Sequence, residues 1–450
     1  MEEIREFLEW LREEYNIPSI SCGIYFEGKK ETVVVGKSDT EKNIEANENT
    51  RYCIGSCTKS FTALAILKLC EEGKLNLKDS PTEYIEELPS EFDNVQLIHL
   101  LSHSSGVPSD SAIEVVVEEE FGLSDYGYNL NSSEGFLNYL NDNTVKSRFK
   151  PSETKLYYNS GYTILGMIIS RVSDTSYERF IQKELLNYLN IDKGEFNLSS
   201  KDEDVATPYR ISNSKLEESS YPTGFAFNPA GGLFLNAKDA AEYMSFLTEG
   251  RFSETSLLNK SNAEKLTEPQ ISANPGASIK NDGSYCLGLY KTEFLGKTVY
   301  CHGGVAQSSS AGIVFDDEEG VMIMTNSNTP FYPSNIAFAI YSILKGKSPD
   351  EVPFFSLNKK LKALEGLYSD EAGVWKFEVE EAHPHLKLSL KSDVEPFEAK
   401  LEPDSHEKDN LKFWSRAENG ERNPSPIEFN EEDGNKVFYY LGHRFERKNQ

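Results

Sequence analysis

The first fifteen residues place apolar side chains at helical spacing among many charges. The apolar positions recur every three or four residues, at Ile4, Phe7, Leu8 and Leu11. This period predicts an amphipathic helix, and charges on its other face are typical of a folded surface rather than of a signal peptide. Nowhere does the chain contain the run of about 18 apolar residues that a membrane helix needs. We therefore expect a cytoplasmic protein without a membrane partner.

Strand-like and helix-like patterns alternate from there to about residue 350. Ser19 to Phe26 and Thr32 to Val35 predict a hairpin with its turn at 27–30, and Ser56 to Glu72 predicts a helix that Gly73 ends. Further helices are predicted at Gln96 to Ser102, Gly161 to Val172, Tyr177 to Leu189, Lys238 to Leu247 and Ser334 to Leu344. Further strands are predicted at Tyr285 to Lys291, Thr298 to Cys301, Ala311 to Phe315 and Val321 to Thr325. Because strands stand at both ends of this region with helices between them, we predict one sheet whose edges come from distant parts of the chain. The expected fold is α/β (α+β), with helices flanking this sheet and a helical subdomain.

The pattern changes after Pro353 to short alternating segments separated by Gly, Pro, Asp and Asn. The predicted strands are Trp375 to Val379, Leu386 to Leu390, Phe397 to Leu401, Leu411 to Trp414, Ile427 to Phe429 and Val437 to Leu441. Short strands at this spacing favour a small antiparallel barrel or sandwich. The expected division is therefore a large domain at residues 1–350 and a smaller one at residues 358–450.

The net charge limits which partners the protein can bind, and the cysteine spacing limits the roles of its thiols. The formal net charge of −27 argues against nucleic acid or an anionic membrane, because both would repel the surface. The six cysteines show no paired spacing typical of zinc sites or disulfides, so reduced, buried thiols are expected. Cys57 and Cys301 adjoin candidate catalytic residues, which leaves a thiol nucleophile as a rival hypothesis, although no matching Cys and His motif accompanies it.

A Ser and a Lys stand one helical turn apart at the start of the predicted helix. Ser56 and Lys59 would share a face, where the lysine amine can reach the hydroxyl and remove its proton. The helix N-terminus would also offer N–H groups to a developing oxyanion. The pattern is common, and its ordinary explanation is a capping serine beside a solvated lysine.

Two further motifs make the catalytic interpretation stronger. Tyr157 and Asn159 stand just before a predicted helix, where a phenol can act as an acid or base and an amide can bind a carbonyl or the lysine. His302 ends a predicted strand and is followed by Gly303 and Gly304, whose bare backbone allows close approach of a substrate. Each motif alone has a plain alternative, namely aromatic packing or a surface histidine in a turn.

Together the three motifs resemble those of the serine β-lactamase and penicillin-binding protein superfamily, in the branch of class C β-lactamases, D-aminopeptidases and esterases. In that branch Y-x-N is the second motif, and His-x-Gly replaces K-T-G. Three stretches add to the resemblance, which covers residues 15–345: Leu97 to Gly106, Phe149 to Glu153 and Pro229 to Leu233.

The resemblance implies a role for each matching residue. Ser56 would be the acylated nucleophile, Lys59 its base partner, Tyr157 a second acid or base, and Asn159 a contact for substrate or lysine. His302 would contact substrate and assist proton transfer. The oxyanion would be bound at Ser56 and at the end of the third motif, by Gly304 and the backbone N–H of Val305.

The sequence departs from the family pattern at two positions. Ser152 stands where glycine is usual, and Tyr158 stands where a small serine is usual, so we expect the bulky ring of Tyr158 to narrow the cleft. Of the remaining histidines, His99 and His103 are expected to be structural. His383 and His385 alternate on a strand, but no third ligand accompanies them, so we expect no metal and no organic cofactor.

The C-terminal segment resembles the lipocalin-like barrel of some archaeal and bacterial members, including self-compartmentalising archaeal serine peptidases of the CubicO group. This resemblance implies a homo-oligomer, such as a closed octamer. We therefore predict a serine peptidase that acts on peptides or other acyl substrates through an acyl-enzyme on Ser56. A carboxylesterase, a β-lactamase-like hydrolase and a non-catalytic protein that binds peptides or scaffolds an assembly remain the alternatives.

Overall fold

The computed structural model describes the chain apart from residues 110, 121–125, 147–148, 213–214, 254–256, 276–282, 383, 392–396, 405–410, 416–425, 433, 441 and 449–450. The described residues form two compact units, Met1–Lys347 and Ser348–Gln450. Within these residues no helix is long and apolar enough to cross a membrane.

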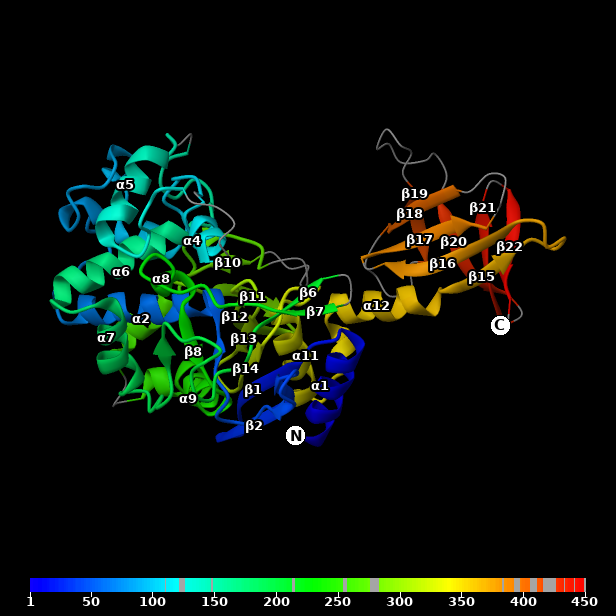
Figure 1. The fold of residues 1–450 in the computed structure, drawn as a ribbon, viewed down its shortest axis with the longest axis horizontal. Coiled ribbons are helices and arrows are strands. Elements are labelled where there is room, and N and C mark those ends of the chain that lie inside the picture. The colour runs from blue at the N-terminus through cyan, green and yellow to red at the C-terminus, as the bar shows by residue number, and fades with distance from the viewer. Residues whose placement is uncertain are drawn as a thin grey trace. The chain divides into compact units, whose positions relative to one another are not determined.

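One antiparallel sheet of nine strands organises the first unit, in the order β3-β2-β1-β14-β13-β12-β11-β10-β9 (Figure 1). Its strands are β1 (Ser19–Phe26), β2 (Lys29–Asp39), β3 (Ile44–Glu45), β9 (Ile271–Ser272), β10 (Ser284–Tyr285), β11 (Tyr290–Phe294), β12 (Lys297–Val305), β13 (Ser310–Phe315) and β14 (Gly320–Thr325). Pairing of β1 with β14 brings the start and the end of this unit side by side. The prediction of one sheet built from distant parts of the chain is confirmed.

Helices cover both faces of this sheet. The helix α9 (Ala237–Thr248) lies so close to β1 that a Cβ on Gly23 would be 2.5 Å from Ala237 O. The helix α11 (Ser334–Leu344) lies equally close to β13, at Gly312. Gly23 pairs with Met322 and Gly312 with Ile323, and consecutive residues of a strand point to opposite faces. The two helices therefore pack on opposite sides, and α1 (Glu2–Glu14) contacts α11.

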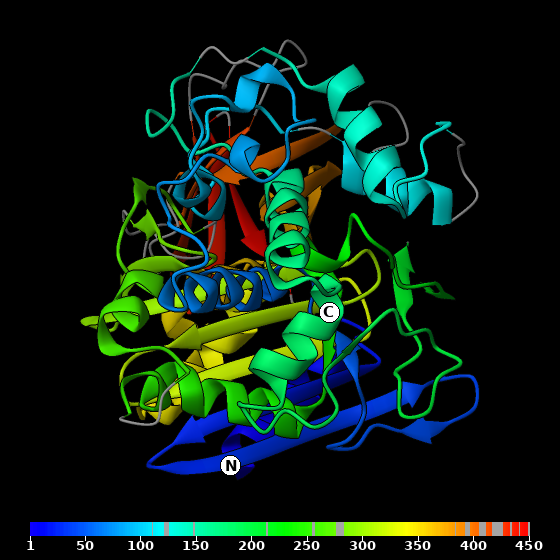
Figure 2. The same ribbon diagram turned by 90° about the vertical axis from the view of Figure 1, so that its left-hand side faces the viewer.

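The helix that carries the S-x-x-K lysine, α2 (Thr58–Glu71), is buried along nearly its whole length. It packs against α6 (Asn159–Ser173), α8 (Asn228–Gly231) and α10 (Lys260–Leu266), and Figure 2 shows it in blue among them. Buried residues lie on every side of this helix, as expected for a helix surrounded by others. The other helices of this unit are α3 (Leu97–Leu101), α4 (Ala112–Glu120), α5 (Ser133–Asn143) and α7 (Tyr177–Phe180).

Two small sheets complete the first unit. One has the order β4-β8-β5, from Tyr52–Cys53, Leu233–Leu235 and Glu195–Phe196, and the other pairs β6 (Tyr209–Ser212) with β7 (Lys215–Glu218). Three predicted elements differ in detail. Ser56 lies in a single 3-10 turn, Gly55–Cys57, ahead of α2. The helix expected at 177–189 divides into α7 and a π-helical turn at Ile181–Leu186, and the strand expected at 285–291 is interrupted between β10 and β11.

The second unit is a closed antiparallel barrel of eight strands, β15 to β22, which confirms the predicted barrel. They are β15 (Gly366–Ser369), β16 (Lys376–Ala382), β17 (His385–Leu390), β18 (Phe397–Pro403), β19 (Lys412–Ser415), β20 (Ile427–Glu432), β21 (Asn435–Tyr440) and β22 (His443–Arg447). Aromatic and aliphatic side chains fill the interior, among them Phe377, Phe429 and Phe438. Leu357 and Leu361 of α12 (Pro353–Ala363), a helix absent from the sequence prediction, join this core.

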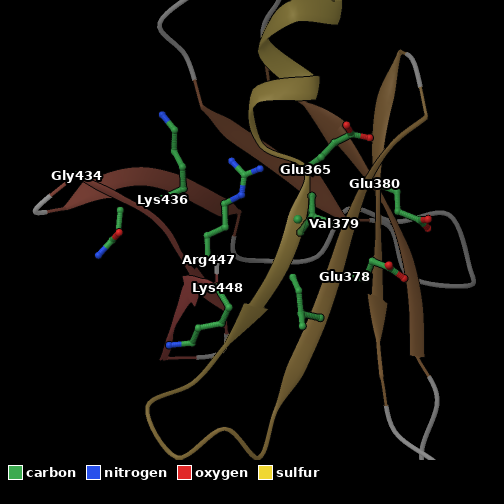
Figure 3. A pocket seen from close by; sticks show the side chains of 11 residues that line it. Glu365, Glu378, Val379, Glu380, Gly434, Lys436, Arg447 and Lys448 are labelled. Carbon is green, nitrogen blue, oxygen red and sulfur yellow. The ribbon is translucent and has the colours of Figure 1, made fainter. Parts of the chain in front are cut away.

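A groove of about 770 Å³ opens on the barrel beside β15. Its charged residues are separated by sign, as Figure 3 shows. Glu365, Glu378 and Glu380 lie along one side, while Lys436, Arg447 and Lys448 lie along the other. The groove is therefore a polar feature of the barrel surface, distinct from the packed interior.

Candidate active site

The nucleophile candidate is held at the junction of the sheet and α2. Ser56 occupies the turn Gly55–Cys57, against which the end of β12 packs. Gly55 adopts φ 50°, and a Cβ on Gly304 would lie 2.0 Å from Ile54 O and 3.0 Å from Ser56 N. A side chain at either position would push the two backbones apart or occupy the space beside the Ser56 amide, so glycine is required at both.

Lys59 is fully buried and its amine faces three oxygens. Nζ lies 3.0 Å from Ser56 Oγ, 2.8 Å from Asn159 Oδ1 and 2.7 Å from Ala230 O. Burial lowers the pKa of Lys59 to about 7. The amide and carbonyl oxygens can only accept, so they take two N–H groups. In the neutral amine the remaining lone pair is then directed at the Ser56 hydroxyl.

Tyr157 contacts the same serine. Its side chain is hydrogen-bonded to Ser56, and Lys59 Nζ lies 5.0 Å from the centre of its ring. Burial raises the pKa of Tyr157 well above its ordinary value, so its phenol carries a proton at neutral pH. Of the two candidate bases, Lys59 is therefore the one that can accept the serine proton in the resting protein.

His103 fixes the backbone that presents Tyr157. Its carbonyl oxygen accepts a hydrogen bond from Leu156 N at 2.8 Å, and its Nδ1 accepts one from Tyr158 N at 3.0 Å. The imidazole is buried, and its ring centre lies 4.1 Å from that of Tyr157. Lys155, two residues before Tyr157, lies on the same side, with its Nζ 5.5 Å from the centre of the Tyr157 ring.

His302 lies beside Tyr157 with both ring nitrogens occupied. Their ring centres are 6.2 Å apart. Gly303 O can only accept, so Nδ1, at 2.7 Å, carries the proton, and Nε2 then accepts from the Tyr285 hydroxyl at 3.1 Å. The ring is 3% exposed, and burial together with the nearby Lys59 lowers the pKa of His302 to about 3. His302 is therefore neutral.

The structure also places the remaining predicted residues. Asn159 is the first residue of α6 and reaches Lys59, and the Val305 backbone N lies against Gly55, next to Ser56. Tyr158 is 1% exposed and stacks on Phe92 at 6.4 Å between ring centres. The expectation that Tyr158 narrows the cleft is thus wrong, because its ring turns into the core.

Among the described residues, the geometry supports neither a catalytic thiol nor a metal site. Cys57 and Cys301 are buried, and burial raises the pKa of both thiols, which disfavours the reactive thiolate. The described residues include no cluster of three possible metal ligands. His385 stands on β17, and its predicted partner His383 lies outside the described residues.

Sequence reasoning missed three side chains next to these residues. Lys155 Nζ donates to the Tyr290 hydroxyl at 2.7 Å, and Tyr285 holds His302. The two tyrosines stand on β10 and β11, about 130 residues from Tyr157, and no local pattern marks them. The sequence could have indicated Lys155, because it stands two residues before Tyr157 and would lie on the same face of an extended segment.

The comparisons with known proteins define the class. The family model described as Beta-lactamase matches residues 4–344, and the chain therefore belongs to the Beta-lactamase family. A second model, described as the Pab87 octamerisation domain, matches residues 349–446. The family resemblance stated from the sequence is thereby confirmed.

Individual relatives agree with this assignment. The solved structure described as the octameric penicillin-binding protein homologue from Pyrococcus abyssi superposes with a TM-score of 0.87 and 29% sequence identity, covering 99% of each chain. Protein flp of Staphylococcus aureus strain N315 is 25% identical over 351 residues, which are 74% of this chain and 64% of the relative. A Providencia stuartii β-lactamase is 26% identical over 249 residues, 54% of this chain and 59% of the relative. The chain thus spans less than two thirds of the length of these last two relatives.

Proposed function

We propose that the protein is a serine peptidase that hydrolyses its substrate through an acyl-enzyme on Ser56. The observation that carries this proposal is the environment of Lys59. Its buried amine has a pKa near 7 and donates hydrogen bonds to Asn159 and Ala230 O. Its lone pair then faces the Ser56 hydroxyl. A neutral amine so placed is a base ready to activate an alcohol.

Acylation then follows from the positions of these groups. Lys59 takes the proton of Ser56 as Oγ bonds to the substrate carbonyl carbon, and the oxyanion is bound by the backbone N–H groups of Ser56 and Val305. As the carbonyl re-forms, the C–N bond breaks. Tyr157, which holds its proton at neutral pH, donates it to the leaving nitrogen and regains one from the Lys59 ammonium. Lys59 then takes a proton from a water molecule as the water oxygen bonds to the acyl carbon, and that proton passes to Ser56 Oγ as the ester C–O bond breaks and the acid product leaves.

His302 has a different part in this scheme. Both its nitrogens are engaged, so proton transfer through it would first require breaking the bond from Tyr285. We propose that Tyr157 protonates the leaving group and that His302 contacts substrate and holds the end of β12, where Gly304 and Val305 border Ser56.

Covalent labelling tests the nucleophile. A fluorescent alkyl phosphonate, incubated with the intact protein, should add its mass to the peptide that contains Ser56. The Ser56→Ala variant should not be labelled, while Ser60→Ala, which changes a serine in the first turn of the following helix α2, serves as a control for folding. Absence of labelling together with absence of turnover of any peptide or ester would favour a non-catalytic peptide-binding protein.

The preference for peptidase activity rests on the resemblance of both domains to those of two-domain serine peptidases, and a comparison of substrates tests it. Rates would be measured for L- and D-amino-acid peptides, p-nitrophenyl esters and a chromogenic cephalosporin. Peptides should give the highest kcat/KM. A cephalosporin faster by orders of magnitude would identify a β-lactamase, and fast esters with inert peptides would identify a carboxylesterase.

We further propose that the chain forms a homo-octamer through its barrel domain. The barrel matches an octamerisation domain, and the structurally similar homologue is described as octameric. The filled interior of the barrel favours a contact role over a ligand-binding one. Light scattering should give a mass eight times that of the 50.7 kDa chain, and a monomeric mass would refute the proposal.

A further inference from the structure

A second lysine stands beside the proposed catalytic residues without a carboxylate partner. Lys155 is half-buried, and its ammonium lies 4.7, 5.4 and 5.5 Å from the ring centres of Tyr290, Tyr285 and Tyr157. Three aromatic faces stabilise a cation there without neutralising it. Among the described residues no Asp or Glu forms an ion pair with Lys155, although Asp and Glu outnumber Lys and Arg by 73 to 46 in the chain.

The ammonium also has unused hydrogen-bonding capacity. Lys155 has three N–H donors, and one of them is given to the Tyr290 hydroxyl at 2.7 Å. Since that oxygen is accepting, the Tyr290 O–H remains available to donate as well, and no described residue is recorded as its acceptor. Two donor groups whose heavy atoms lie 2.7 Å apart, one an ammonium and one a phenol, match the two oxygens of a carboxylate.

The position of this pair links it to the reaction. The ring of Tyr157, whose side chain is bonded to Ser56, lies within 5.5 Å of both Lys59 and Lys155. An anion held by Lys155 would therefore sit close to the carbonyl that Ser56 attacks. Lys59 cannot bind such an anion, because its three hydrogen-bonding positions are already directed at Ser56, Asn159 and Ala230.

We propose that Lys155 and Tyr290 form a carboxylate-binding subsite, so that the protein prefers substrates with a carboxylate next to the scissile bond. This inference rests on the proposed function for its kinetic consequence. The carboxylate can belong to the acyl part of the substrate or to the leaving part, and the geometry of the two donors is the same for both.

Two matched substrate pairs distinguish these sources. For the leaving part, an N-acetylated dipeptide acid is compared with its C-terminal amide. For the acyl part, p-nitrophenyl hemisuccinate is compared with p-nitrophenyl butyrate. In Lys155→Met the preference for the charged member of at least one pair should fall about tenfold or more, as expected for loss of a charge-assisted hydrogen bond. Lys155→Arg should keep part of the preference, and Lys150→Met, which removes an exposed lysine of the same loop, should keep all of it.

A binding measurement separates failure of this inference from failure of the proposed function. Calorimetry with the unreactive Ser56→Ala protein compares the dipeptide acid and hemisuccinate with their neutral counterparts, with and without Lys155→Met. Loss of charge preference in binding supports the subsite even if no substrate is turned over. A carboxylate preference that is absent, or that survives Lys155→Met in both turnover and binding, overturns it while leaving Ser56 labelling unaffected.

Discussion

Lys59 Nζ lies 3.0 Å from Ser56 Oγ, in a buried position where no carboxylate of the described residues pairs with the amine. A lysine in such surroundings loses much of its preference for the charged form, because water no longer solvates the ammonium. The contact between these two residues is therefore one between a hydroxyl and an amine that is substantially neutral at physiological pH. The first two predictions test this relationship.

Removal of the Lys59 amine should abolish activation of Ser56. Lys59→Met keeps the length and apolar stem of the side chain but deletes the base, and the rate of phosphonate labelling should fall by about 10²- to 10⁴-fold. Lys68→Met is a matched control on the same helix, since Lys68 is paired with Glu72 at 3.6 Å. Equal labelling of the two variants would show that Lys59 is not the base.

The pH dependence of labelling should follow the protonation of Lys59. Burial lowers the pKa of this lysine from 10.5 to about 7, so the ammonium predominates below pH 7 and the basic amine above it. The labelling rate should therefore rise through pH 7 and level off above it. His302, with a pKa near 3, stays neutral over this range. A rate that is flat between pH 6 and 9 would contradict the assignment.

Gly304→Ala should damage the oxyanion site. The new methyl group would meet Ile54 O at 2.0 Å and stand 3.0 Å from Ser56 N, so the backbone of β12 would have to move away from Ser56. Loss of one oxyanion donor costs about 10²- to 10³-fold in kcat. At Gly303 the nearest atom to an added methyl is 3.5 Å away, on Tyr332, so Gly303→Ala should cause a much smaller loss of kcat. Similar losses in both variants would argue against this explanation.

The barrel should depend on α12. Leu361 is fully buried in the barrel core, and Leu361→Ala should lower the free energy of unfolding of this unit by about 2–5 kcal/mol. Tryptophan fluorescence during urea unfolding reports on the barrel through Trp375 and Trp414. Lys359→Ala on the same helix removes an exposed ion pair to Asp350 and should change the free energy of unfolding little, because solvent screens such a pair. A loss for Leu361→Ala no larger than this control would show that α12 is dispensable for the barrel.

Much of the fold was predictable because its signals are local. The period of Ile4, Leu8 and Leu11 predicted α1, and alternation in the last ninety residues predicted most barrel strands. The helix α12 was missed because it begins at Pro353, at the boundary between the two predicted domains, where the pattern of apolar residues changes. Tyr158 was misjudged for a related reason, since the sequence does not reveal whether an aromatic ring turns into the cleft or towards Phe92.

For the candidate site, the sequence by itself determined which residues could react. The three-residue spacing of Ser56 and Lys59 puts them together on any helical turn, and two motifs more than a hundred residues away supplied the phenol, amide and imidazole. Only the tertiary structure decided the protonation of these groups. Lys59 loses its preference for the charged form, Tyr157 keeps its proton and His302 stays neutral because of burial by distant segments and hydrogen bonds to Ala230 O, Asn159 and Tyr285. Spacing is a property of neighbours along the chain, whereas solvation of a charge depends on everything that surrounds it in space.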